Sequence, residues 1–177
     1  MKKFKWQVAV LAFLLTLGAA VGIVKLRQRQ MVNEPLYERI GSLTGVKAVD
    51  LCQEEGQLVV QVQLAYVQNL ATTYQALTAE LNQLLAPDSY RLEIVDARNS
   101  FLTDALFTVS PALYEGEQRG NFTEMGKSIA AALAELEITE HRLTVDKTHI
   151  YLQIKAGDAY LYEVVAREQR SKEGVRT

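Results

Sequence analysis

The feature that most constrains this chain is an uncharged apolar run near its N-terminus, at residues 8–24 (VAVLAFLLTLGAAVGIV). A helix of that run is about 26 Å long, close to the roughly 30 Å hydrocarbon thickness of a bilayer. Trp6 precedes the run and Lys25 and Arg27 follow it, as is typical of a membrane interface. We therefore expect a transmembrane helix that contacts the lipid bilayer through residues 7–24.

Basic residues on both sides of this run bear on its orientation. Lys2, Lys3 and Lys5, with the free amine, give the N-terminal side a slight excess of positive charge. We expect residues 1–24 to be a signal anchor with a cytoplasmic N-terminus, so that the protein is a single-pass protein of the cell membrane and its domain is extracytoplasmic. The alternative is a signal peptide cleaved near Ala20, which would release a secreted protein. The apolar run continues past that point, which favours the anchor. A buried core helix is disfavoured because the run lacks a polar face.

Charge and cysteine content exclude several classes of function. Between residues 30 and 170 there are 11 Lys and Arg against 20 Asp and Glu. An acidic domain repels phosphate backbones, so no nucleic-acid partner is expected. The single cysteine, Cys52, allows no intrachain disulfide and no thiolate cage for zinc.

The polar and basic residues 25–33 predict a juxtamembrane linker, and residues 34–97 predict an αββαβ unit. Apolar residues at helical spacing give a helix from residue 34, and a turn at residues 54–56 joins two alternating strands into a hairpin with one wet face. Asn69 caps the next helix, and a third strand follows near residue 90.

Residues 98–168 predict one or two helices followed by a three-stranded antiparallel meander, before a polar tail at residues 169–177. Ser100 and Ser110 are each a possible helix start, but Gly116 and Gly120 weaken both predictions, so the details of residues 98–120 stay open. Asn121 and Glu124 have the spacing of a capping box. The fold class is therefore α+β, with sheets packed against helices.

Three tyrosines on the last two strands, Tyr151, Tyr160 and Tyr162, are a candidate interaction surface. A three-residue loop at residues 156–158 would turn Tyr160 and Tyr162 to the core with Ile150. A two-residue loop would turn the tyrosines outward, where an aromatic patch marks a partner surface. The first register is preferred because it keeps Glu163 out of the core.

Candidate chemical groups are few. A two-residue turn at Asp146 and Lys147 would pair Thr144 with His149 and place His141 and His149 on opposite faces, which argues against a shared metal. Residues 126–128 (GKS) lack the spacing and the preceding strand of a phosphate-binding loop. We expect no catalytic residue, no metal and no cofactor, and therefore no enzyme.

The αββαβ order behind one membrane segment resembles the ring-building-motif domains of bacterial secretion, flagellar and sporulation assembly proteins. In those families a short helix leads through a Gly-Val step into the first strand, as Gly45-Val46 does here. The resemblance covers residues 34–97 and implies a non-catalytic subunit that packs side by side with copies of itself or with a related chain. We expect self-association or a membrane-protein partner. We expect a scaffold or assembly subunit. The alternatives are an extracytoplasmic ligand-binding or sensor module and, with less support, an enzyme that uses carboxylates.

Overall fold

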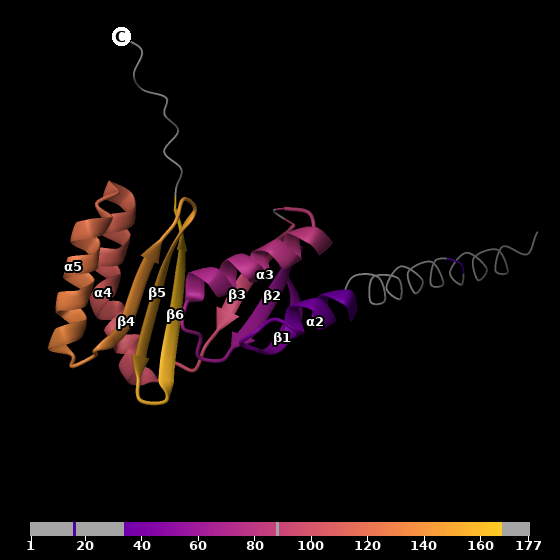
Figure 1. Cartoon of the computed structure of the whole chain (residues 1–177). Helices are drawn as coiled ribbons and strands as arrows, with labels where there is room; N and C mark the ends of the chain where they lie inside the picture. The colour runs from indigo at the N-terminus through magenta and orange to yellow at the C-terminus, as the bar shows by residue number, and fades with distance from the viewer. Residues whose placement is uncertain (1–15, 17–33, 88, 168–177) are drawn as a thin grey trace, which may run out of the picture.

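The computed structural model describes Thr16, residues 34–87 and residues 89–167. Within these residues the protein is α+β, with two three-stranded sheets and four helices (Figure 1). The expected fold class is confirmed at this level. The expected transmembrane helix lies outside the described residues, as do the signal peptide alternative, the linker at residues 25–33 and the tail at residues 169–177.

The first half of the described chain has the order αββαβ. Its elements are α2 (Glu34–Gly41), β1 (Val46–Glu54), β2 (Gln57–Leu64), α3 (Leu70–Leu84) and β3 (Tyr90–Val95). The sheet order is β1-β2-β3, with β1 antiparallel and β3 parallel to β2. The alternation in β2 buries Val60, Val62 and Leu64 against the two helices. The other face of this sheet is polar, and there Gln61 donates to Glu93 at 3.0 Å.

The second half consists of two helices and an antiparallel meander. Its elements are α4 (Ser100–Arg119), α5 (Phe122–Glu135), β4 (Glu140–Val145), β5 (His149–Ala156) and β6 (Ala159–Ala166). The sheet order is β4-β5-β6. A second core, between one face of this sheet and the two helices, contains Leu102, Ile129, Leu152 and Leu161.

Residues 98–120, which the sequence leaves open, form one helix. Asn99, and not Ser100, is its N-cap and accepts from the Leu102 N–H at 2.9 Å. Pro111 lies inside α4 on its exposed side, where the backbone carbonyl it leaves without an intrahelical partner can face water. Ser110 therefore does not start a second helix. Gly116 does not interrupt α4 either. It lies where α4 and α5 come close together, and a Cβ there would lie 2.5 Å from the Met125 Cβ of α5.

The capping box expected at Asn121 does not form. Asn121 makes no side-chain cap hydrogen bond, and the Glu124 carboxylate pairs with Lys127 at 3.0 Å. Gly120, with φ of 70°, turns α4 directly into α5, so the chain reaches Asn121 with a backbone geometry (φ −94°, ψ 56°) outside the extended region usual for a cap.

Both loops of the meander differ from the preferred registers. In the first, the Asp146 N–H bonds the His149 carbonyl and the chain turns at residues 147–148, one position later than expected, so that Thr144 pairs with Tyr151 and not with His149. The shift is two positions, and His141 and His149 still lie on opposite faces. The second loop has two residues, because Ala156 pairs with Ala159. Tyr160 and Tyr162 thus share the face of Tyr151, opposite Ile150, Leu152 and Ile154.

The physical reason for the second difference is the position of Glu163 at the sheet edge. Glu163 does lie on the same face as Leu152, but β6 is an edge strand and the side chain is only half-buried, near Arg98. Burial raises the pKa of Glu163, and the Arg98 charge acts in the opposite direction. Glu163 can therefore lie on the side of β6 that faces α4 and α5, which leaves Tyr160 and Tyr162 on the other side.

The β4–β6 sheet is the central layer of the described chain. Helices α4 and α5 cover one face, and the first half of the chain packs against the other (Figure 1). The tyrosine face is thus buried as well, although against different elements from those expected.

Candidate interaction surfaces

The tyrosines predicted as an interaction surface bind the chain's own backbone. The Tyr160 hydroxyl donates to the Leu64 carbonyl at 2.7 Å, and the Tyr162 hydroxyl donates to the Ala65 carbonyl at 3.1 Å. The Val67 N–H donates to the same Tyr162 oxygen at 2.7 Å, and burial raises the pKa of Tyr162 to about 12. These bonds fix the connection between β2 and α3, whose irregular backbone has few partners of its own.

Gln153 completes this interface from the adjacent strand. It is 4% exposed, its Oε1 accepts from the Leu70 N–H at 2.8 Å, and its Nε2 donates to the Val67 carbonyl at 2.9 Å. Leu70 is the first residue of α3, where backbone N–H groups lack intrahelical partners. One side-chain amide therefore anchors the start of α3 to the central sheet.

Asp146 anchors the other end of the interface. Its carboxylate accepts from the backbone N–H groups of Thr148 and His149, both at 2.7 Å, from Gln75 of α3 at 2.9 Å and from the Tyr151 hydroxyl at 2.8 Å. Burial acts to raise the pKa of Asp146, but these four donors outweigh it and hold the pKa well below the ordinary value. Burial and the Asp146 charge raise the pKa of Tyr151. The group is a structural network within the chain.

The chain that connects the two halves closes the outer edge of β6. Tyr160 donates its N–H to the Ala97 carbonyl at 3.3 Å, and Tyr162 donates its N–H to the Asp96 carboxylate at 2.7 Å. Arg98 bonds both that carboxylate, at 2.7 Å, and the Tyr162 carbonyl, at 3.1 Å. Residues 96–98 thus serve in place of a fourth strand.

These contacts show that the three tyrosines predicted as an interaction surface are buried inside the chain. Tyr151, Tyr160 and Tyr162 are 1%, 6% and 3% exposed, so they form an internal interface and not an open surface for another molecule. The interface residues Trp6, Lys25 and Arg27 lie outside the described residues. No helix in the described part of the chain is both long enough and apolar enough to cross a membrane.

An exposed surface that the sequence analysis missed lies on α4. Phe107, Pro111 and Tyr114 follow each other at i, i+4 and i+7 on the exposed side of the helix, and we call them the aromatic ridge. Phe107 is 71% exposed and Tyr114 is 50% exposed. The signal was present, because Leu102, Val109 and Leu113 already define a complete buried stripe and leave these aromatic residues outside it.

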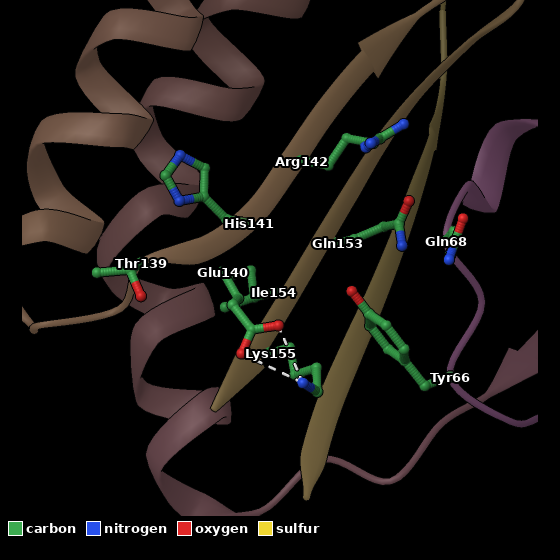
Figure 2. Close-up of a pocket in the computed structure, with 9 residues that line it drawn as sticks. All are labelled: Tyr66, Gln68, Thr139, Glu140, His141, Arg142, Gln153, Ile154 and Lys155. Atoms are coloured by element: carbon green, nitrogen blue, oxygen red, sulfur yellow. Dashed lines mark hydrogen bonds and ion pairs between the residues drawn. The ribbon is translucent and has the colours of Figure 1, made fainter. Parts of the chain in front are cut away.

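A cleft of about 240 Å³ lies between the β4–β6 sheet and the connection from β2 to α3. Figure 2 shows Tyr66 and Gln68 on one side and Arg142, Gln153 and Lys155 on the other. Lys155 bonds Glu140 at 2.9 Å and lies 5.1 Å from the centre of the Tyr66 ring. His141, also labelled in the figure, points from β4 toward the helices, as its register position requires.

The titratable side chains of the described residues do not form a metal site. Residues 34–87 and 89–167 contain no group of three His, Cys, Asp or Glu side chains placed to hold a metal ion. Cys52 is half-buried and free. Its neighbour across the strand pair is Val59, on the polar face of the first sheet.

Comparisons of the chain with protein-family models, curated proteins and solved structures gave no match.

Proposed function

We propose that this chain is a single-pass membrane protein whose extracytoplasmic α+β part acts as a scaffold or assembly subunit through protein–protein contacts. The single observation that carries the proposal is the aromatic ridge of α4. Aromatic side chains are enriched at protein interfaces, and fully burying a side chain such as Phe107 gains roughly 1.5–3 kcal/mol. A partner that covers the ridge would gain this free energy.

The position of the ridge supports this role. Because Leu102, Val109 and Leu113 hold the opposite side of α4 in the core, the ridge stands on a fixed helix and not on a loop. A rigid surface loses little conformational entropy when it binds. Asp104 is exposed one turn before Phe107, whereas Glu115 is already paired with Arg119, so the partner surface should combine an apolar groove with a basic residue facing Asp104.

Element order gives further support. The order α2-β1-β2-α3-β3 is the one on which the resemblance to ring-building-motif domains rests. That resemblance stays a proposal, and with it the idea that the chain packs beside copies of itself or beside another membrane protein.

The test is short-range crosslinking of the full chain in native membranes, with the adduct masses read directly. The double variant Phe107→Glu/Tyr114→Glu should lower the yield of the main adduct at least about tenfold, since burying two charges in an apolar contact is unfavourable. Thr123→Glu/Ala131→Glu adds the same charge to exposed positions of the neighbouring helix α5, away from the ridge, and should leave the yield unchanged. Absence of any adduct, or equal loss in both variants, would overturn the proposal.

Membrane attachment has its own test. The protein isolated from cells should keep its N-terminal residues, resist extraction from membranes by carbonate and be digested by protease added from outside. A mature N-terminus near Ala20 would instead show the secreted alternative, and protection from external protease would overturn the proposed orientation.

A second candidate function, an extracytoplasmic ligand-binding or sensor module, is favoured by the cleft in Figure 2. The cleft presents two cations, Arg142 and Lys155, and one carboxylate, Glu140, beside the Tyr66 ring. These groups suit a small carboxylate that stacks on an aromatic ring. Thermal stabilisation of the full chain by a panel of aromatic and aliphatic carboxylates tests it, and Arg142→Gln should abolish any stabilisation.

A further inference from the structure

One side of the β4 backbone has no hydrogen-bond partner among the residues that the structure describes. Strand β4 is an edge strand whose only neighbour in the described residues is β5. The Asp146 N–H donates to the His149 carbonyl at 3.0 Å, and hydrogen-bonded pairs alternate along an antiparallel ladder. By this alternation Arg142 and Thr144 bond to β5, whereas His141, Leu143 and Val145 direct their N–H and C=O groups away from the sheet. Within residues 34–87 and 89–167 no group hydrogen-bonds to them.

The opposite edge of the same sheet, strand β6, is covered by another segment of the chain. Residues 96–98 cover β6 with both backbone and side-chain bonds. Exposed strand edges bind other strands unless charge, proline or a covering segment prevents it. No proline lies in β4, and its two charged side chains are of opposite sign.

The charges of β4 are complementary to those of a second β4. Glu140 and Arg142 are two residues apart and therefore on the same face of the strand. Arg142 is exposed and has no ion-pair partner within the described part of the chain. Glu140 binds Lys155 at 2.9 Å, and a carboxylate can accept further hydrogen bonds.

We propose that β4 pairs antiparallel with β4 of a second copy of this chain, around a two-fold axis at His141, to make a continuous six-stranded sheet. In this register Glu140 of each copy lies opposite Arg142 of the other, and opposite charges stabilise a cross-strand pair. The inference deepens the proposed assembly role and rests on it.

Neighbouring registers are less favourable. An axis at Arg142 brings the two guanidinium groups directly opposite each other, and like charges in that position are destabilising. An axis at Leu143 sets Glu140 opposite Asp146 of the second copy. Moving the axis by one residue shifts the pairing by two positions, so the outward N–H and C=O groups of the two strands can still bond to each other. The charges, and not the backbone geometry, therefore select the axis at His141.

A single strand pair is a small interface, below the area that stable soluble complexes bury. Attachment to a membrane raises the effective concentration of one copy around another and compensates for a small contact. The self-association should therefore be strong in membranes and weak for dilute protein in detergent.

Disulfide trapping tests the register in the full chain in native membranes, with Cys52→Ser as background. The proposed axis puts the two His141 Cα atoms about 5.5 Å apart, within the range of a disulfide, so His141→Cys should give a dimer on oxidation. Leu143→Cys lies about 14 Å from its counterpart, and Thr148→Cys, in the turn beyond the end of β4, lies more than about 25 Å from its own, so both should stay monomeric. Dimers through Leu143→Cys but not through His141→Cys would overturn the proposed register.

Charge reversal tests the interface without a new cysteine. Arg142→Glu places two carboxylates opposite each other and should lower the yield of chemically crosslinked dimer about fivefold or more. Lys147→Glu makes the same change in net charge at an exposed position beyond the end of β4 and should leave the yield unchanged. Circular dichroism of both variants checks that the fold is retained.

The outcomes separate this inference from the proposed function. Self-adducts of the native chain that persist in Arg142→Glu, with no dimer from His141→Cys, would overturn β4 pairing and leave the assembly role standing. Absence of self-adducts in the native chain, with one adduct to a different protein, would overturn β4 pairing and support an assembly role with that partner. Absence of any adduct would overturn both.

Discussion

Gln153 allows the coupling between the two halves of the chain to be measured. Gln153→Ala removes two hydrogen bonds, to the Leu70 N–H and to the Val67 carbonyl, from a side chain that is 4% exposed. A buried group left without a partner costs about 1–3 kcal/mol. Gln153 lines the cleft, so in the variant a water molecule can bond to the half-buried Val67 carbonyl. The Leu70 N–H is buried and is less accessible to water. We expect the free energy of unfolding to fall by about 2–4 kcal/mol.

The assay is urea unfolding of the full chain in detergent, followed by circular dichroism. With a slope of about 2 kcal/mol per molar urea, the midpoint should fall by about 1–2 M. Gln153→Leu keeps the volume but removes the same bonds and should lose nearly as much stability. Gln61→Ala is the matched control, because its amide makes one half-buried bond to Glu93 and its loss should cost less than about 1 kcal/mol.

A midpoint for Gln153→Ala equal to that for Gln61→Ala would refute the reasoning. It would mean that water satisfies both backbone groups and that the start of α3 does not depend on the central sheet. A large loss in Gln153→Ala with full stability in Gln153→Leu would show that packing, and not hydrogen bonding, holds the interface.

Three further predictions concern stability. Gly116→Ala should destabilise the chain by about 1–2 kcal/mol, because the added Cβ would clash with Met125. Gly126→Ala should stabilise it by up to about 1 kcal/mol, because the added Cβ makes an ordinary 3.7 Å contact with Leu143, and thermal unfolding compares the two variants. Asn69→Ala should cost about 1 kcal/mol in urea unfolding and Asn121→Ala almost nothing, since the Asn69 side chain caps α3 whereas the Asn121 side chain makes no cap bond to α5. The pKa of Asp146 is lower when folded than when unfolded, so its stabilisation is complete well above the ordinary Asp pKa of about 3.9 and is lost as the pH falls below it. Asp146→Asn should therefore flatten the decline in stability between about pH 5 and pH 2, and an unchanged pH profile would contradict this assignment.

The elements that could be predicted from the sequence are those with a local signal. The alternation in β2 places Val60, Val62 and Leu64 in the first core, and the helical spacing in α3 does the same for Leu70, Leu77 and Leu81, although Val59 on the other face of β2 is buried as well. The sequence left residues 98–120 open because Ser110-Pro111 and Gly116 are local signals for a helix boundary, and only the tertiary structure shows that Gly116 is there to let α4 pack closely on Met125 of α5.

The candidate sites could be predicted less well. The aromatic ridge was visible as aromatic residues outside a complete buried stripe, but its exposure depends on α5 packing against the other side of α4. The open edge of β4 had no local signal, since strand order decides which strand is at an edge.

By itself, the sequence determined the α+β class and the order of the elements, because hydrophobic period and helix caps act over a few residues. Only the tertiary structure decided what Tyr151, Tyr160 and Tyr162 do. Changing one loop from three residues to two reverses the face of every side chain in β6, and a difference that small in loop length has no clear local signal. What settles the register is long-range, since the tyrosine hydroxyls and Gln153 supply hydrogen bonds to backbone more than 80 residues away in the chain.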